Sequence, residues 1–301
     1  MRLVFLGSPP EAEGALRALH DAGHEIALVV TQPDRKRGRG GGLVPSPVKK
    51  AAIELGLTVV TPERCKEALD DIAGSGAELG VVVAFGQLIP PSVLAALPAG
   101  YVNVHFSLLP RWRGAAPVER AILEGDTETG VCLMQLEAGL DTGPVYACRT
   151  IPITADDTAG DLRRRLADLG TELLLTEIDS VPGRTPKAQE GDETYAAKLS
   201  VEEFAVDWSR PAAELARLVM AGNPKPGAWT TAKGARLKLL RAKAEPAADA
   251  AGSAQPGTVV GPGRVATGDG VLVLIEVQPE GKAAMAASAW AAGFRGDRLG
   301  A

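Results

Sequence analysis

Apolar and polar positions follow two patterns along the first part of the chain, continuous apolar runs and apolar residues at helical spacing. Apolar runs at Leu3–Leu6, Glu25–Thr31 and Leu79–Ala84 have the length and composition of strands buried on both faces. Between the first two runs, apolar residues recur at helical spacing, at Ala12, Ala15, Leu16 and Leu19. A strand, a helix and a second strand in this order predict the beginning of an α/β, doubly wound sheet.

The predicted sheet continues with further strands and ends at a long helix. Strands are expected at Gly130–Leu136 and Val145–Thr150, and the helix from Thr158 to about Ser180. We place the end of this first domain at residue 183, so that it spans residues 1–183. Residues 184–203 are polar and contain glycine and proline, which is typical of a linker.

Residues 204–301 have a different pattern and predict a second domain. One helix is expected at Ala212–Met220. Short alternating runs follow it, at Leu237–Leu240, Thr258–Val260, Val265–Thr267 and Val271–Val277. Short strands at this spacing favour a small β-barrel, similar to an OB-fold.

Composition limits the classes of protein that remain. The 301 residues are 46% hydrophobic and 23% charged, as in an ordinary globular protein, and no apolar run approaches the ~20 residues of a membrane span. The first residues resemble a strand rather than a signal peptide, so we expect a cytoplasmic protein, and we expect a monomer. The formal net charge is -5, so any nucleic-acid site must be a local basic patch. Cys65, Cys132 and Cys148 lack metal-ligand spacing; we expect no metal, and buried thiols in a reducing compartment.

The strand predicted after Tyr101 carries the candidate chemistry. Val102, Val104 and Phe106 alternate with Asn103 and His105, so the amide and the imidazole share one strand face. Open α/β sheets place their chemistry at the carboxyl ends of strands. The alternative is an edge strand whose polar side chains only satisfy nearby backbone groups.

Three motifs decide between these interpretations. Asn103-x-His105 is followed by Ser-Leu-Leu-Pro at Ser107–Pro110 and by Leu-Asp-Thr-Gly at Leu140–Gly143. Together they resemble the pattern of the folate-dependent formyltransferases. The resemblance implies a Rossmann-like catalytic domain, with 10-formyltetrahydrofolate as co-substrate and an amine as acceptor. It also implies that Asn103, His105 and Asp141 are catalytic.

Formyl transfer explains why these residue types are needed. An amine attacks the formyl carbon and its oxygen becomes an anion, which the amide NH₂ of Asn103 and an imidazole N–H of His105 could stabilise. The resemblance places the Asp141 carboxylate beside the imidazole, where it would fix the tautomer and hold a proton. The attacking group belongs to the substrate, so no nucleophilic side chain is required.

The resemblance also implies a folate pocket. In the family, the segment that corresponds to Phe85-Gly86 lies against the pterin, and the segment that corresponds to Ser107, Leu108, Leu109 and Pro110 shapes the pocket. The alternatives are a plain strand-to-helix turn at the first segment and a rigid turn at the second, both of which would exist without a ligand.

A basic, glycine-rich loop at residues 32–46 points to the acceptor. It resembles the inserted loop by which the methionyl-tRNA formyltransferases in this family contact tRNA, so initiator methionyl-tRNA is the expected partner. The expected tRNA-binding residues are Arg35, Lys36, Arg37 and Arg39, and the second domain, residues 204–301, is also expected to contact tRNA. For the loop itself, the alternative is a solvated run of charges. For the protein, the alternatives are another acceptor, such as a sugar nucleotide or glycinamide nucleotide, a folate hydrolase, and a non-catalytic RNA-binding relative.

Overall fold

The computed structural model describes residues 1–36, 41–246 and 254–300. Contacts divide the chain into two compact units. Unit 1 comprises Met1–Pro117, Thr129–Ile151 and Arg163–Ala196. Unit 2 comprises Val118–Glu128, Pro152–Leu162 and the residues from Ala197 onward. The domain boundaries at residues 183 and 204 stay a prediction.

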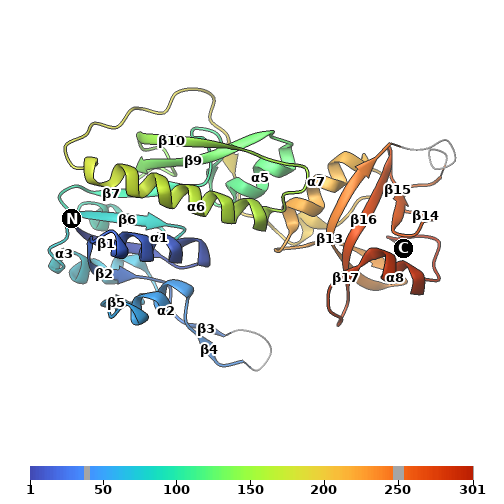
Figure 1. Ribbon diagram of the computed structural model, residues 1–301, viewed down its shortest axis with the longest axis horizontal. Helices are drawn as coiled ribbons and strands as arrows, with labels where there is room; N and C mark the ends of the chain where they lie inside the picture. Colours follow the sequence, from blue (N-terminus) through green and yellow to red (C-terminus); the bar gives the residue numbers. More distant parts are fainter. Residues whose placement is uncertain (37–40, 247–253, 301) are drawn as a thin grey trace. The chain divides into compact units, whose positions relative to one another are not determined.

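Unit 1 is organised around a seven-stranded sheet with the order β10-β9-β7-β6-β1-β2-β5 (Figure 1). Its strands are β1 (Arg2–Gly7), β2 (Glu25–Val30), β5 (Val59–Val60), β6 (Leu79–Val83), β7 (Tyr101–His105), β9 (Glu128–Gln135) and β10 (Val145–Pro152). The neighbours from β5 to β7 pair in parallel, whereas β7 and β9 pair antiparallel. The sheet is therefore mostly parallel, as the sequence predicts.

The strand order reverses at β1. The chain runs from β1 outward to β2 and β5, and then returns to place β6 and β7 on the other side of β1. Open α/β sheets bind their ligands outside the carboxyl ends of the strands at such a reversal. His105 is the last residue of β7, and so it lies at this edge.

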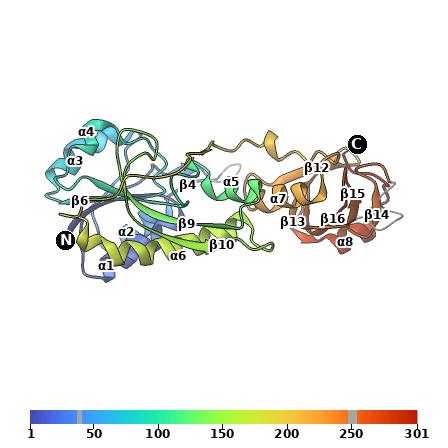
Figure 2. The same ribbon diagram turned by 90° about the horizontal axis from the view of Figure 1, so that it is seen from above.

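Helices cover both faces of the sheet, as a doubly wound fold requires. They are α1 (Pro10–Asp21), α2 (Pro47–Glu54), η1 (Cys65–Ala68), α3 (Leu69–Gly74), α4 (Pro91–Leu94), α6 (Ala159–Glu177) and η2 (Ile178–Ser180). Figure 2 shows α3 and α4 on one side of the sheet and α1 and α6 on the other. The apolar face predicted for the first helix is confirmed, because Ala12, Ala15, Leu16 and Leu19 are its buried residues.

Two segments expected to be irregular form short strands instead. The basic loop contains an antiparallel hairpin of β3 (Arg35–Lys36) and β4 (Leu43–Val44). Within the expected linker, β11 (Tyr195–Ala196) pairs in parallel with β8 (Arg113–Gly114). Backbone hydrogen bonds form these ladders, and hydrophobic periodicity carries no signal for them.

Unit 2 contains an antiparallel sheet with the order β12-β13-β16-β15-β14, and β17 pairs with β16. Its elements are α5 (Pro117–Glu124), η3 (Glu202–Phe204), α7 (Ala212–Gly222), β12 (Ala228–Ala232), β13 (Ala235–Glu245), β14 (Val259–Gly261), β15 (Arg264–Ala266), β16 (Val271–Pro279), β17 (Met285–Ala286) and α8 (Ala287–Gly293). The predicted fold class is confirmed as an α/β part followed by an antiparallel β part, whereas closure of the second sheet into a barrel stays a prediction. Of the helices in the described residues, none is long and apolar enough to cross a membrane.

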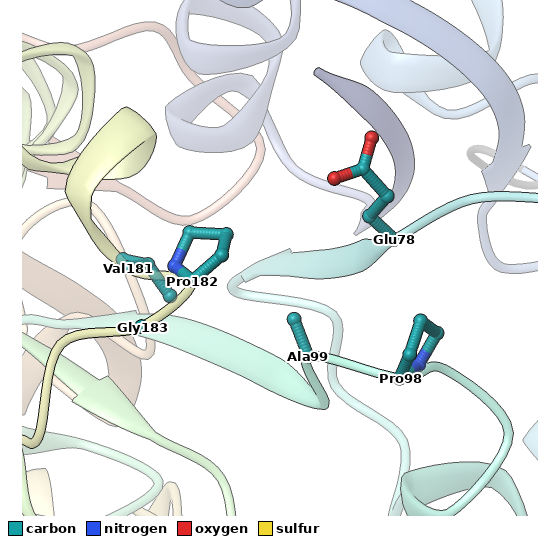
Figure 3. Close-up of a pocket in the computed structure, with 6 residues that line it drawn as sticks. All are labelled: Glu78, Pro98, Ala99, Val181, Pro182 and Gly183. Atoms are coloured by element: carbon teal, nitrogen blue, oxygen red, sulfur yellow. The ribbon is translucent and has the colours of Figure 1, made fainter.

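A hollow of about 360 Å³ lies where β6 and β7 begin, at the edge of the sheet opposite His105. Proline and small residues form most of its lining, and Glu78 is the charged member of the set (Figure 3). The lining residues are Glu78, Pro98, Ala99, Val181, Pro182 and Gly183.

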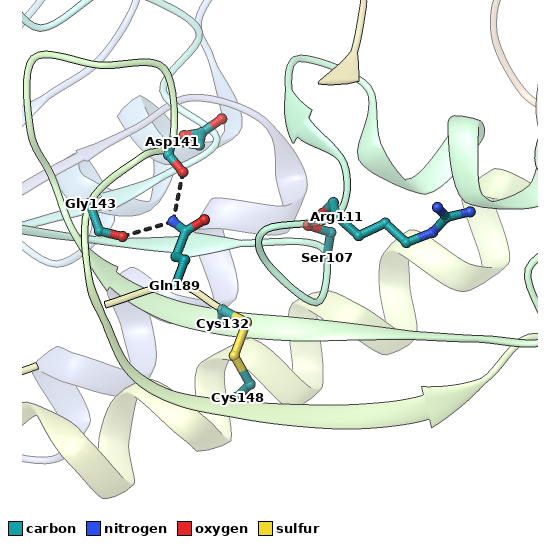
Figure 4. Close-up of a disulfide and its surroundings, with 7 residues drawn as sticks. All are labelled: Ser107, Arg111, Cys132, Asp141, Gly143, Cys148 and Gln189. Carbon is teal, nitrogen blue, oxygen red and sulfur yellow. Dashed lines mark hydrogen bonds between the residues drawn. A yellow bond between two sulfur atoms is a disulfide. The ribbon is translucent and has the colours of Figure 1, made fainter. Parts of the chain in front are cut away.

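Two of the three cysteines form a disulfide, which corrects the expectation of buried thiols. Cys132 on β9 and Cys148 on β10 are joined across neighbouring strands, with their Cα atoms 4.1 Å apart (Figure 4). Cys65 is free and buried, and burial raises the pKa of its thiol to about 11. Strand order, which cysteine spacing does not reveal, brings the pair together.

This disulfide should stabilise the fold, because it closes a loop in the unfolded chain. For a sequence separation of 16 residues, the loop-closure model gives about 3 kcal/mol. Replacing both Cys132 and Cys148 by serine should lower the free energy of unfolding in urea by that amount. Dithiothreitol should destabilise the unsubstituted protein and leave the double variant unchanged. Equal stability of the unsubstituted protein with and without dithiothreitol would contradict the prediction.

Candidate active site

Strand β7 lies between β6 and β9 in the sheet. Asn103 and His105 are two residues apart on β7, so their side chains share one face of the strand. Asn103 pairs in register with Val82 and Met134, and His105 pairs with Cys132. The imidazole is almost fully buried, and Asn103 is half-buried. Within the described residues, no hydrogen bond ties the Asn103 amide to the protein, so this polar group is available to a ligand.

The His105 ring lies between two oxygen atoms. Its Nε2 is 2.9 Å from the carbonyl oxygen of Trp112, and its Nδ1 is 3.7 Å from Oδ2 of Asp141. A carbonyl oxygen can only accept, so Nε2 carries a proton and donates it to Trp112. The separation at Nδ1 exceeds hydrogen-bond length, so a proton would pass to Asp141 after a small approach or through a water molecule.

Asp141 is held in place by its own loop and by the segment after β7. Its φ of 52° lies in the left-handed region, which aspartate tolerates better than most residues. The backbone N–H of Gly114 donates to Oδ2 at 2.8 Å. Gly114 itself has a φ of 120°, and a Cβ there would lie 2.7 Å from the carbonyl oxygen of Ala196. The approach of β11 therefore requires glycine at this position.

The Ser-Leu-Leu-Pro segment forms a tight turn at the end of β7. Ser107 is fully buried, and its hydroxyl donates to the carbonyl of Arg111 at 2.6 Å. Leu108 and Leu109 are half-buried, and Pro110 is buried. This turn therefore stabilises the chain beside His105, and the two leucines are its accessible apolar surface.

Phe85 and Gly86 lie at the carboxyl end of β6. The Phe85 side chain packs into the hydrophobic core and is 2% exposed. Its carbonyl oxygen accepts hydrogen bonds from Ser8 Oγ at 3.3 Å and Gln32 Nε2 at 3.0 Å. Gly86 has a φ of 75°, which favours glycine. The predicted pocket segment therefore offers backbone, and not the phenyl ring, to a ligand.

The basic hairpin exposes part of the predicted tRNA-binding set. Arg35 and Lys36 are exposed on β3, whereas Arg37 and Arg39 lie outside the described residues. Lys49, at the start of α2, makes an ion pair with Asp34 at 2.8 Å. This ion pair neutralises the charge of Lys49, so the positive charge of this region is concentrated at Arg35 and Lys36 on the hairpin.

Two polar side chains near Asp141 escape the sequence prediction. Gln189 donates to the backbone carbonyls of Asp141 and Gly143, each at 2.8 Å (Figure 4). Arg113 in turn donates to Gln189. Arg113 follows a recognised motif, but its role could not be assigned from sequence. Gln189 lies in the expected linker and carried no signal. Within the described residues, no cluster of three or more His, Cys, Asp or Glu residues could hold a metal ion.

Comparison with known proteins identifies the family. A formyl transferase family model matches residues 1–178, and a formyl transferase C-terminal domain model matches residues 198–295. The chain belongs to the formyl transferase family. Methionyl-tRNA formyltransferases of Thiobacillus denitrificans and Symbiobacterium thermophilum are 48% and 46% identical to it. These alignments cover 100% of both chains in the first case, and 97% of this chain and 92% of the relative in the second.

Solved formyltransferase structures share the fold at low sequence identity. An N-formyltransferase from Helicobacter canadensis, in complex with folinic acid and dTDP-3-aminofucose, superposes with a TM-score of 0.67. Its sequence is 16% identical, and the match covers 90% of this chain and 98% of that one. At this identity the likeness establishes the fold, and the acceptor must be argued from the nearer relatives.

Proposed function

We propose that this protein transfers the formyl group of 10-formyltetrahydrofolate to the α-amino group of methionyl-tRNA, in support of translation initiation. The observation that carries the proposal is the convergence of Asn103, His105 and Asp141 at the carboxyl end of β7. The relatives at 46–48% identity over nearly the whole chain support methionyl-tRNA as the acceptor. An aminoacylated tRNA substrate is consistent with a cytoplasmic location.

The proposed chemistry follows from what each group can donate or accept. The amine attacks the formyl carbon, a C–N bond forms, and the C–N bond to the folate nitrogen breaks. One proton leaves the attacking amine, and the folate nitrogen takes one up. Asn103 donates to the developing oxyanion, because the Nε2–H of His105 is already bonded to Trp112. Nδ1 of His105 and the Asp141 carboxylate handle the proton.

We assign the folate to the space bounded by the turn after β7 and the backbone that follows β6. Leu108 and Leu109 would supply apolar contacts, while buried Ser107 and Pro110 keep the turn rigid. At Phe85 and Gly86 the ligand would meet backbone groups. Folate binding therefore depends on groups other than the three proposed catalytic side chains.

The acceptor is tested by supplying labelled 10-formyltetrahydrofolate with methionyl-tRNA, with an aminosugar nucleotide, or with water alone. We expect label on the amino group of methionyl-tRNA, with little on the sugar and little free formate. Preferential labelling of the aminosugar would assign the protein to the sugar-nucleotide branch. Rapid release of formate without an acceptor would identify a hydrolase, and no consumption of formyl-folate would indicate a non-catalytic relative.

The hairpin should provide salt-dependent affinity for tRNA. Each phosphate contact lowers the logarithm of the tRNA affinity by about 0.7–0.9 per log unit of added salt. Replacing both Arg35 and Lys36 by glutamine should therefore flatten the slope by about 1.4–1.8. Folate affinity should be unchanged, since these side chains are not part of the folate site.

A matched control is Lys66→Gln, which removes an exposed positive charge from η1. Its slope should equal that of the unsubstituted protein. The slopes are measured as methionyl-tRNA affinity between low and high salt, with folate titrated in parallel. The same slope in the hairpin variant and the unsubstituted protein would reduce the hairpin to a solvated surface feature.

A further inference from the structure

Gln189 occupies an unusual position between the catalytic loop and a buried arginine. Both hydrogens of its carboxamide are donated, one to the carbonyl of Asp141 and one to the carbonyl of Gly143, each at 2.8 Å (Figure 4). Its Oε1 accepts from Nε of Arg113 at 3.0 Å and from Nη2 at 2.8 Å. The full hydrogen-bonding capacity of a glutamine side chain is thus used.

The loop that Gln189 holds is otherwise exposed. Residues 137–140 are exposed, and Asp141 has a left-handed backbone, which costs free energy and persists only where its surroundings hold it. The two hydrogen bonds from Gln189 fall on Asp141 and two residues beyond it, so they fix the backbone direction at Asp141. That direction determines where the carboxylate points.

Arg113 determines the orientation of the carboxamide. Its guanidinium is buried, makes an ion pair with Glu193, and directs two N–H groups at Oε1 of Gln189. A flipped carboxamide would place NH₂ against the guanidinium and its oxygen against two carbonyls. The next residue, Gly114, binds the Asp141 carboxylate directly. The segment Arg113–Gly114 therefore holds Asp141 in two ways. Gly114 binds its carboxylate, and Arg113 holds its backbone through Gln189.

We propose that Gln189 is a positioning residue, which keeps Oδ2 of Asp141 close to Nδ1 of His105. The proposal rests on the catalytic role of Asp141 proposed above. The polar segment between α6 and β11 then has a second role besides connecting two parts of the chain. Through Gln189 it holds the proton-handling carboxylate of Asp141 in place.

The test is Gln189→Glu, which keeps the size and the Arg113 contact but turns a donor into an acceptor facing two carbonyls. A displacement of about 1 Å at a reacting group can lower the reaction rate about 10²-fold, so kcat should fall by about that factor. KM for formyl-folate and for methionyl-tRNA should change little. Gln189→Met, which removes the bonds without introducing repulsion, should lose less. Gln278→Glu in unit 2, where the amide donates to the Lys282 carbonyl, is the matched control and should keep full kcat.

A double-variant cycle separates positioning from general stability. If Gln189 acts through Asp141, adding Gln189→Glu to Asp141→Asn should slow turnover no further. Multiplicative losses, or a kcat that follows the melting temperature across the Gln189 variants, would overturn the proposal. A normal kcat in Gln189→Glu, beside a damaged Asp141→Asn, would also overturn it while leaving the proposed function intact. A harmless Asp141→Asn would instead refute the catalytic role on which the inference rests.

Discussion

Replacing Asn103 by alanine is expected to lower turnover by roughly 10²–10³-fold, the usual cost of removing one oxyanion donor. Asn103 shares a strand face with His105, and its amide is half-buried and available to a ligand. Nε2 of His105 donates to Trp112, so the site relies on the Asn103 amide for this donor. The measurement is single-turnover formyl transfer at saturating folate and methionyl-tRNA.

Asn103→Asp is the matched variant, because it preserves the size of the side chain and removes the NH₂ donor. It should be at least as slow as Asn103→Ala, since a carboxylate would repel the developing negative charge. The melting temperature of the alanine variant should stay close to that of the unsubstituted protein. Near-normal turnover in either variant would remove Asn103 from the mechanism.

Local periodicity was sufficient to predict the parts of the site that lie close together in sequence. Alternation along β7 predicts that Asn103 and His105 share a face, and the structure has them on one five-residue strand. Asp141 is different, since β8, α5 and β9 lie between it and β7 in the sequence. Its approach to His105 depends on the antiparallel pairing of β7 with β9, which no local pattern encodes. Only the resemblance to a family indicates that contact.

Two features escaped prediction because they depend on long-range polar or covalent pairing. The Cys132–Cys148 bond requires β9 and β10 to be neighbours, which is a property of the whole sheet. The segment that carries Gln189 has the composition of a linker, yet it binds Arg113 and the Asp141 loop through hydrogen bonds. Hydrophobic patterning detects apolar burial, so a segment held by hydrogen bonds is missed.

Asp141→Asn is expected to lower turnover steeply, by roughly 10²–10⁴-fold, the range of general acid–base contributions. The substitution keeps the shape, and the remaining amide oxygen can still accept from the N–H of Gly114. The same oxygen faces Nδ1 of His105, but it now belongs to a neutral amide, so the negative charge that would hold a proton there is lost. The uncharged ring would be favoured, and proton transfer would slow.

Folate affinity separates this role from a purely structural one. Leu108, Leu109 and the backbone after β6 supply the proposed folate contacts, so the Kd for formyl-folate should change little in Asp141→Asn. Asp70→Asn removes an exposed carboxylate from the first turn of α3 and serves as the matched control, with turnover expected to be unchanged. Turnover and folate binding are measured on the same preparations. If folate binding collapses in Asp141→Asn while turnover at saturation survives, Asp141 is a pocket residue, and the proton must be handled elsewhere in the site.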